Sequence, residues 1–172
     1  MPYIKPANGN YSSIEDVANL IGYVLNPEKR CNDIWGTRLL YSSPDHKMTA
    51  QQIIDINLHY GKTQGSLMKH IIISYSYLDG PITVELIHNA LKAVLSTILF
   101  GFPCVYALHE NTAHPHFHLA LGSVNLYTGM KYPDTKETLR IIADTMAMYT
   151  SYKTMDGKTV FLKYNTIADK MV

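Results

Sequence analysis

The strongest constraint on the fold is a segment in which four of the eight histidines fall within ten residues, from His109 to His118. Around His118, imidazole and apolar side chains alternate, because His116 precedes Phe117 and Leu119 follows His118. Alternation with a period of two is typical of a β-strand that buries one face. His116 and His118 are therefore predicted to point to the same side of a sheet.

The residues that precede this segment predict that it is one half of a β-hairpin. Residues 104–109 are predicted to form a second short strand, and the six residues from Glu110 to Pro115 suffice to reverse the chain. In that hairpin His109 lies opposite or close to His116, with Cβ atoms about 5 Å apart. Three neutral imidazoles on one face suit a divalent metal ion and leave positions open for water or substrate. The alternative is a cluster of polar surface histidines or hydrogen-bonded core groups.

Length and composition are those of an ordinary soluble protein. The 172 residues predict a single domain, residues 1–172, that is large enough to bury a core. The net charge of only +1 gives no general basic signature of nucleic-acid binding, although a metal and a few cations can hold phosphate locally. Cys31 and Cys104 are far apart and form no CxxC pattern, so we expect reduced thiols.

No pattern at the start of the chain resembles a signal peptide. The longest uncharged stretch, residues 93–108, is interrupted by Gly101 and Pro103 and is too short to span a membrane. We therefore expect a protein of the cytoplasm that does not insert into a membrane.

The patterns of apolar residues and caps predict an α+β fold. A capping-box pattern at Ser12 and Glu15 predicts that a helix begins there, and Thr49 is predicted to cap a second helix. We expect a central antiparallel β-sheet of about five strands, with helices packed mainly on one face and the other face free for a metal and a ligand. The predicted strands are 3–5, 38–41, 69–76, 104–109, the second strand of the hairpin with His116 and His118, and 158–162. The predicted helices are 12–25, 49–60, 83–100 and 135–149.

Four segments in order carry a resemblance to a known family. They are IGYVLNPEK at residues 21–29, KHIIISYS at 69–76, the histidine segment at 109–118, and VNLYTGMKY at 124–132. Together they resemble the relaxases of mobilisable plasmids and integrative elements, and more narrowly the MobA/VirD2-type group of Gram-positive bacteria. The similarity runs from near the start of the chain to about residue 152.

The resemblance implies a histidine–hydrophobe–histidine (HUH) endonuclease fold and a site- and strand-specific nick at an origin of transfer. The metal ligands of the family match His109, His116 and His118, and its nucleophile matches Tyr23. The implied partner is single-stranded DNA at that origin, together with accessory relaxosome proteins and a coupling protein in the bacterial cytoplasm. The implied process is conjugative transfer or mobilisation.

The chain departs from the family where an acidic residue often follows the first histidine by two positions, because Asn111 stands there next to Glu110. Glu110, His114 and Asn125 are candidates for supporting roles. His114 lies in the turn, so we treat it as a neighbour of the metal site and not as a ligand.

Three cations are candidates for DNA contacts, Lys29, Arg30 and Lys131. The alternative is that each is a solvated surface charge. Trp35 is predicted to be either a core anchor or a base-stacking residue.

The chemistry that the resemblance implies is metal-assisted transesterification. A phenol with an ordinary pKa of about 10 is a poor nucleophile at neutral pH. A divalent ion, Mn²⁺ or Mg²⁺ by expectation, with Zn²⁺, Co²⁺ or Ni²⁺ also suited to imidazole, makes the phosphate more electrophilic. Attack by the tyrosine leaves a 5′-phosphotyrosine and a free 3′-hydroxyl.

Other functions fit the same residues. A rolling-circle replication initiator or single-strand transposase of the HUH class would use Tyr149 or Tyr152 as the nucleophile. A hydrolase would use metal-bound water, and a metal-stabilised DNA-binding module would have no activity. The remaining histidines, His46, His59, His70 and His88, are isolated in the sequence, and no chemistry is predicted for them.

Overall fold

The structure is a computed structural model that describes residues 2–75, 80 and 82–166. Four helices and eight strands occur in the described part of the chain. In order they are β1 (Tyr3–Pro6), α1 (Ile14–Val24), β2 (Arg30–Arg38), α2 (His46–His59), β3 (Met68–Ser74), α3 (Val84–Ser96), β4 (Cys104–His109), β5 (His116–Gly122), α4 (Lys136–Tyr149), β6 (Ser151–Lys153), β7 (Thr159–Phe161) and β8 (Asn165–Thr166).

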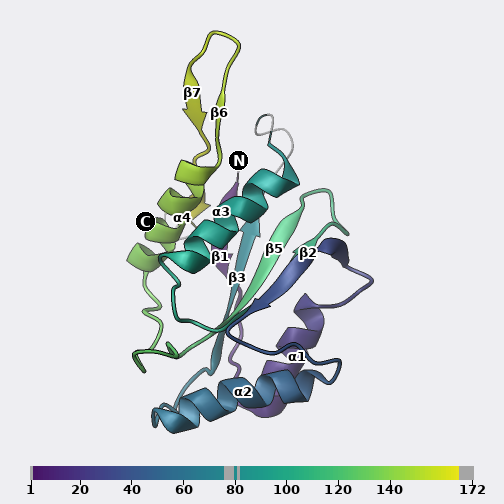
Figure 1. The fold of residues 1–172 in the computed structure, drawn as a ribbon, viewed down its shortest axis with the longest axis vertical. Coiled ribbons are helices and arrows are strands. Elements are labelled where there is room, and N and C mark those ends of the chain that lie inside the picture. The colour runs from purple at the N-terminus through teal and green to yellow at the C-terminus, as the bar shows by residue number, and fades with distance from the viewer. Residues whose placement is uncertain (1, 76–79, 81, 167–172) are drawn as a thin grey trace. The chain divides into compact units, whose positions relative to one another are not determined.

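Six of the strands form one sheet in the order β2-β4-β5-β3-β1-β8, and β6 pairs with β7 in a separate hairpin (Figure 1). The pairs β2–β4 and β4–β5 are antiparallel, whereas β1 and β8 are parallel. The predicted α+β class with a mostly antiparallel central sheet is therefore confirmed, and β3 is an inner strand as expected. The sheet has six strands where about five were predicted.

The chain divides into two compact units that interleave in sequence. The site unit consists of Pro6–Ile72 and Gly101–Tyr132, and it contains α1, β2, α2, β4, β5 and most of β3. The α3–α4 unit consists of Met1–Lys5, Ile73–Phe100 and Pro133–Val172. Each unit is described by itself below.

The β4–β5 hairpin of the site unit has the register that the sequence predicts. His109 pairs directly with His116, and Ala107 pairs with His118. Directly paired residues project to the same side of a sheet, and so do residues two apart on one strand. The three histidines therefore share one face, which we call the histidine face.

Helix α1 begins one residue later than its sequence pattern suggested. Ser13 is the N-cap, and its side chain accepts a hydrogen bond from the backbone N–H of Asp16. The Asp16 carboxylate in turn accepts from the N–H groups of Ser13 and Ser12. The capping box is therefore Ser13 with Asp16, and the predicted pair of Ser12 with Glu15 was wrong by one position.

The histidine face is not free of helices, contrary to our expectation. A core cluster joins buried residues of α1 and α2, among them Val17, Ile21 and Ile53, to Ala107 and Ala120 on that face. Helix α1 therefore packs on the face that carries the histidines. This packing brings the end of the helix to the three histidines.

Strand β2 was not predicted. The sequence indicated a loop as far as Gly36 and a strand at residues 38–41, whereas the strand runs over Arg30–Arg38 and ends before Leu39, whose φ is +58°. Its pairing with β4 is interrupted between Arg30 and Trp35 by a register shift. This irregularity and its partly exposed residues remove the alternation that marks a strand in sequence.

Two helix boundaries also differ from the predictions. Helix α2 begins at His46 with Asp45 as its N-cap, and Thr49 lies inside it, where its hydroxyl donates to the Tyr41 carbonyl. Helix α3 begins as predicted after Thr83 but ends at Ser96, not at Phe100. The strand predicted for 69–76 is β3, Met68–Ser74, and Ser76 lies outside the described residues.

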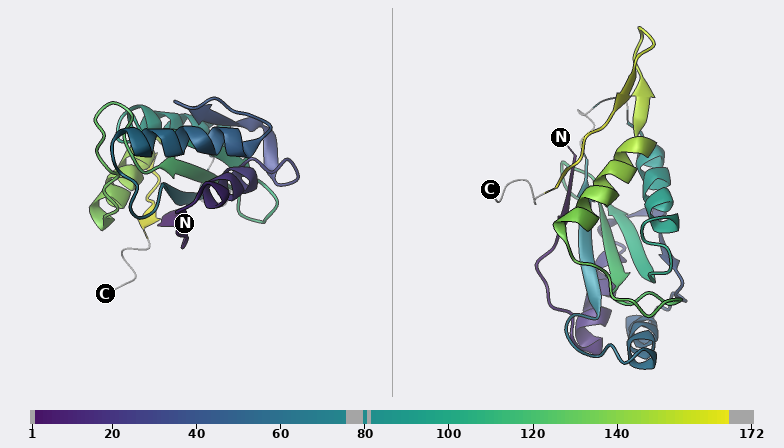
Figure 2. Two further views of the ribbon diagram at one scale, coloured as in Figure 1. Left: turned by 90° about the horizontal axis from the view of Figure 1, so that it is seen from below. Right: turned by 90° about the vertical axis from the view of Figure 1, so that its left-hand side faces the viewer.

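In the α3–α4 unit the two helices pack against each other, and α4 also contacts β8. The β6–β7 hairpin extends from the end of α4 (Figure 2). Strand β7, Thr159–Phe161, lies within the strand predicted for residues 158–162. Among the described residues, no helix has both the length and the apolar character needed to cross a bilayer.

Candidate metal centre and nucleophile

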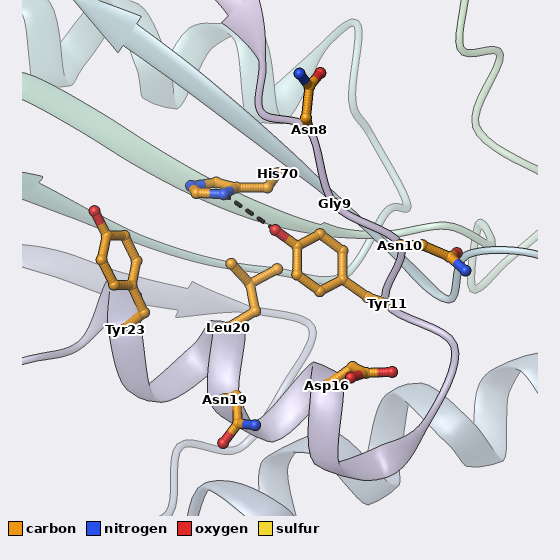
Figure 3. Close-up of a pocket in the computed structure, with 9 residues that line it drawn as sticks. All are labelled: Asn8, Gly9, Asn10, Tyr11, Asp16, Asn19, Leu20, Tyr23 and His70. Atoms are coloured by element: carbon orange, nitrogen blue, oxygen red, sulfur yellow. Dashed lines mark hydrogen bonds between the residues drawn. The ribbon is translucent and has the colours of Figure 1, made fainter.

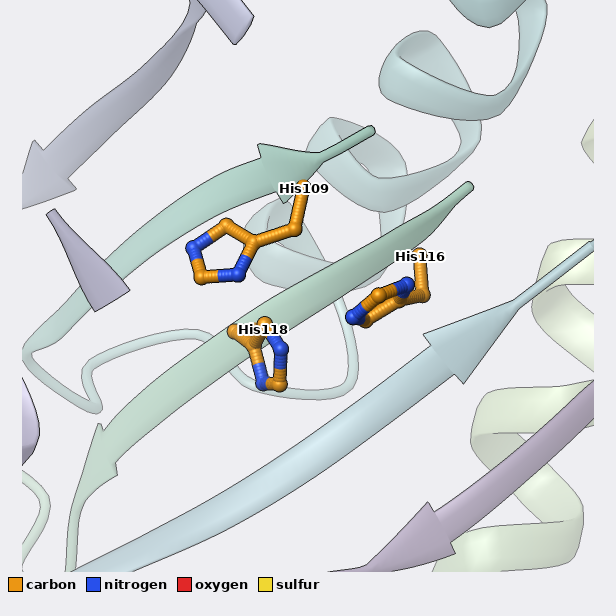
Figure 4. Close-up of side chains that lie close together, drawn as sticks. All are labelled: His109, His116 and His118. Atoms are coloured by element: carbon orange, nitrogen blue, oxygen red, sulfur yellow. The ribbon is translucent and has the colours of Figure 1, made fainter. Parts of the chain in front are cut away.

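Three histidines converge at the turn end of the β4–β5 hairpin. His109 is the last residue of β4, and His116 and His118 lie near the start of β5 (Figure 4). One ring nitrogen from each lies within 4.8 Å of the others, so the three residues could hold one metal ion. His109 and His118 are buried, and His116 is half-buried.

Hydrogen bonds to backbone carbonyls fix which nitrogen two of these rings present. His109 Nε2 lies 2.9 Å from the Val24 carbonyl oxygen, and His116 Nδ1 lies 2.9 Å from the His114 carbonyl oxygen. Because a carbonyl can only accept, both of these ring nitrogens carry the proton and donate. The lone pairs therefore sit on Nδ1 of His109 and Nε2 of His116. Orientation of ligand histidines by a second hydrogen bond is typical of metal sites in proteins.

The third histidine is oriented by another imidazole. His118 Nδ1 lies 2.7 Å from His70 Nε2, and His70 Nδ1 lies 3.3 Å from the Tyr11 hydroxyl, as the dashed line in Figure 3 marks. If His118 presents its Nε2 lone pair, Nδ1–H donates to His70, and His70 Nδ1–H donates to Tyr11. The prediction that His70 is isolated was therefore wrong, because β3 lies beside β5 in the sheet.

The nitrogens left for a metal have no other partner. His109 Nδ1 and His118 Nε2 are buried and make no hydrogen bond to any described part of the chain. Buried polar atoms are normally satisfied, so two orphan lone pairs on one face need an explanation. A bound cation supplies it, and the residues present therefore fit a divalent metal.

The environment keeps the histidines neutral, which is the form that binds metal. Burial lowers the pKa of His118 to about 2, with neighbouring imidazoles and Lys29 adding to the effect. Burial also lowers the pKa of His70 to about 4, and it lowers the pKa of His109. His109 and His118 thus need no deprotonation step at neutral pH before they can bind a cation.

Tyr23 lies in the last turn of α1 beside these rings. Its ring centroid is 5.0 Å from that of His118, 5.6 Å from His109 and 6.1 Å from His70. The side chain is nevertheless 41% exposed, which leaves it accessible to a polymer in solvent. The next residue, Val24, is the one whose carbonyl accepts from His109, so the metal ligand also ties down the end of the helix.

A pocket of about 430 Å³ opens next to Tyr23 in the site unit (Figure 3). Tyr11, Tyr23 and His70 contribute aromatic rings to its wall, and Leu20 forms its apolar part. Neither Tyr11 nor this pocket was predicted. No local pattern in the sequence marks Tyr11, because its partner His70 is 59 residues away in the chain. His70 in turn reaches His118 only because β3 lies next to β5 in the sheet.

The candidate supporting residues fall in different places. Glu110 is exposed, and its backbone N–H donates to the Lys29 carbonyl. His114 is exposed in the turn and contributes its carbonyl to His116. Asn125 is buried, and its side-chain oxygen accepts from the N–H groups of Tyr127 and Thr128, which makes it a turn residue.

Two of the three candidate DNA-binding cations lie over aromatic rings, and one of these rings is that of Tyr23. The ammonium of Lys29 lies 4.6 Å from the ring centroid of Tyr23, and the guanidinium of Arg30 lies 4.6 Å from that of Trp35. Lys131 instead donates to the backbone carbonyl of Gln64.

The rival tyrosines belong to the α3–α4 unit. Tyr149 is the last residue of α4 and is half exposed, and Tyr152 lies in β6. In that unit a Cβ at Gly80 would meet the ring of Tyr152, so this ring packs against the glycine.

Comparison with known proteins agrees with this geometry. Residues 23–151 match the family described as relaxase, MobA/VirD2-like, nuclease domain. Among proteins of curated function, no significant match is found. The match covers most of the chain and includes Tyr23, both strands of the histidine hairpin and helices α2, α3 and α4. The chain therefore belongs to the relaxase family, through its MobA/VirD2-like nuclease domain.

Proposed function

We propose that the protein nicks one strand of DNA by transesterification, with Tyr23 as the nucleophile. The Tyr23 hydroxyl oxygen forms a bond to the scissile phosphorus and loses its proton to solvent. The bond from phosphorus to the 3′-oxygen breaks, and this oxygen takes up a proton. The products are a 5′-phosphotyrosine and a free 3′-hydroxyl, and reversal of the same step reseals the strand.

One observation carries the proposal: an exposed tyrosine lies with its ring centroid 5.0 Å from that of a buried metal-ligand candidate, His118. The hydrogen bond from His109 to Val24 would hold the helix end, and so Tyr23, in register with the ligands. Lys29, above the Tyr23 ring, would attract the phosphate that the tyrosine attacks. The chain's own groups would thus position both reactants.

His109, His116 and His118 would hold a divalent cation, Mn²⁺ or Mg²⁺ by expectation, with Zn²⁺, Co²⁺ or Ni²⁺ as alternatives. When bound, such an ion would stabilise the charge that develops on the phosphate oxygens. The chain's part is to present one nitrogen lone pair from each of the three imidazole rings. Hydrogen bonds to Val24, His114 and His70 would keep these lone pairs aimed at one point.

The biological setting follows from the family. We infer that residues 1–172 act as one relaxase domain on single-stranded DNA at an origin of transfer, with site and strand specificity. The reaction would begin conjugative transfer or mobilisation of a plasmid or integrative element in the bacterial cytoplasm. Accessory relaxosome proteins and a coupling protein would be its partners, and Glu110, His114 and Asn125 would support the site.

The test is a search for a covalent adduct. The protein is incubated with Mn²⁺ or Mg²⁺ and a labelled pool of random-sequence single strands, and adducts that survive denaturant are recovered and sequenced. A denaturant-resistant adduct with an enriched sequence supports the transesterase. Cleavage without an adduct would point to a hydrolase, and binding alone would point to an inactive module; either result overturns the proposal.

A further inference from the structure

Two neighbouring residues each place a cation over an aromatic ring. Lys29 lies over Tyr23 and Arg30 lies over Trp35, both at 4.6 Å from the ring centroid. Lys29 and Arg30 are consecutive, and Arg30 pairs with His109, whose ring centroid lies 5.6 Å from that of Tyr23. The two pairs therefore both lie near the proposed nucleophile, and we call them together the strip. Alternating aromatic and cationic side chains are the recurring surface on which proteins bind single-stranded nucleic acid.

The register of β2 places the far end of this strip on the histidine face. Arg30 pairs with His109 and Trp35 pairs with Ala107 on β4. Arg30 and Trp35 are five positions apart along the chain, yet their partners are two apart, so the irregularity between them makes them neighbours on one face. The irregularity thus builds the Arg30–Trp35 pair on the face that carries the metal ligands.

Trp35 is not a core anchor, because its side chain is 38% exposed. Beside it is a pocket of about 400 Å³ with a mixed lining that includes Arg30, Trp35, Ser42, Ser43 and His46. This lining offers an aromatic surface, a cation and the hydroxyl of Ser42 in one place. An unpaired nucleotide requires the same combination, with the ring for its base and the polar groups for its sugar and phosphate.

The Arg30 guanidinium is held in place before any ligand arrives. Its Nε donates to the carbonyl of Leu25, the C-cap of α1, at 3.1 Å, and Nη1 donates to the Asn32 carbonyl at 3.4 Å. Two backbone contacts fix the plane of the group over the indole. A base or phosphate that binds there therefore meets a surface that loses little side-chain freedom.

Resting on the proposed nicking function, we propose that the Arg30–Trp35 pair and its pocket bind one unpaired nucleotide of the DNA strand next to the scissile phosphate. The base stacks on the aromatic and guanidinium surface, and the Ser42 hydroxyl faces its sugar and phosphate. Stacked bases in a duplex cannot reach this surface without unpairing. The subsite thus selects single-stranded over double-stranded DNA.

Trp35 is the only tryptophan of the chain, so its fluorescence reports on this subsite alone. The probe is single-stranded oligo(dT), titrated into the Tyr23→Phe protein to exclude chemistry, with the matching oligo(dT)·oligo(dA) duplex as a comparison. We expect saturable quenching by the single strand, with the same Kd that fluorescence anisotropy of a labelled strand gives. The duplex is expected to quench far less at the same concentration.

Substitution at Trp35 provides a second readout. Trp35→Ala should weaken binding of the single strand by roughly 5- to 150-fold, the range for loss of one stacked base, and Trp35→Phe should recover most of it. Tyr127→Ala is the matched control, because Tyr127 is an exposed aromatic residue of the same unit. Thermal unfolding of each variant verifies that it folds. If Trp35→Ala does not fold, quenching of Trp35 in the Tyr23→Phe protein decides whether the subsite exists.

The outcomes separate this inference from the proposed function. One outcome overturns the subsite and leaves the nicking proposal standing. In it, anisotropy shows that the strand binds, the tryptophan emission does not change, and Trp35→Ala binds the strand with unchanged affinity. Quenching as expected, in a protein with Tyr23 intact that forms no adduct, overturns the nicking proposal and leaves the subsite. Absence of any oligo(dT) binding overturns the subsite, and the adduct search with the random-sequence pool then decides the nicking proposal by itself.

Discussion

The β4–β5 hairpin and the edge strand β2 contribute to the same face of the sheet, but they differ in burial and regularity. All six residues of β4 are buried, and its pairing with β5 runs without interruption from Cys104 to His109. Strand β2 has no buried residue and pairs irregularly. The buried hairpin holds groups that must keep a fixed geometry, whereas the edge strand exposes Arg30 and Trp35 to a flexible polymer. The predictions below test this division.

The largest effect should come from removing a ligand from the hairpin. His118→Ala deletes one metal-facing nitrogen, so we expect loss of Mn²⁺ binding by calorimetry and a rate of adduct formation reduced by roughly 10³-fold or more. His59→Ala is the matched control, because it removes an exposed imidazole on α2 in the same unit, outside the histidine cluster. Wild-type metal affinity in His118→Ala would show that the hairpin does not hold the ion.

The two cysteines report on the two strands directly. Cys31 is half-buried on β2, whereas Cys104 is buried on β4, and burial raises the pKa of its thiol to about 12. In the folded protein at neutral pH we expect Cys104 to react with iodoacetamide on the order of 10²-fold or more slowly than an ordinary thiol.

The rate at Cys104 should keep rising with pH toward that value, because only the thiolate reacts. Peptide mass mapping assigns the label to each cysteine, and the same reaction in denaturant is the control, where both should react alike. Equal reaction rates of Cys31 and Cys104 in the folded protein would contradict the claim that the β4–β5 hairpin is more rigid and more buried than strand β2.

A moderate effect is expected at His70, which orients a ligand without contacting the metal. His70→Ala removes the acceptor of the His118 Nδ1–H, and we expect metal affinity to fall by about 10- to 100-fold. His70→Gln retains a carbonyl oxygen as an acceptor and should recover part of that affinity. Calorimetry with Mn²⁺ measures both variants, with thermal unfolding of the metal-free proteins as the control. An unchanged affinity in His70→Ala would exclude the orienting role.

The smallest effect should come from a cation at the start of the strip. Lys29→Gln removes one candidate phosphate contact, so log Kd for oligo(dT) should depend less steeply on log salt, by about 0.7. Lys62→Gln removes an exposed lysine elsewhere in the site unit and should leave the slope unchanged. If the two variants show the same slope, Lys29 does not contact the strand.

How far the sequence predicts this molecule depends on the range of the interactions involved. The hairpin register could be predicted, because the alternation of His116, Phe117 and His118 and a six-residue turn are local features. Helix α4 could also be predicted, since the helix expected over residues 135–149 is observed over Lys136–Tyr149. Tyr23 was singled out by its place in the IGYVLNPEK segment, and the structure brings it beside the histidines.

The sequence could not predict what depends on contacts distant in the chain. His70 and His118 are 48 residues apart, and only the order of strands in the sheet makes them neighbours. Strand β2 was missed because its irregular pairing destroys the period of two. The place of α1 on the histidine face was missed for a similar reason, because an apolar stripe shows that a helix packs but not on which face.

The most direct test of the central claim is to identify the tyrosine that carries the DNA. The covalent adduct is digested and mapped by mass spectrometry, in the wild-type protein and in Tyr23→Phe and Tyr149→Phe. We predict a nucleotide linked to the peptide that contains Tyr23, no adduct in Tyr23→Phe, and an unchanged amount in Tyr149→Phe. An adduct that persists in Tyr23→Phe, or that maps to Tyr149 or Tyr152, would contradict the account.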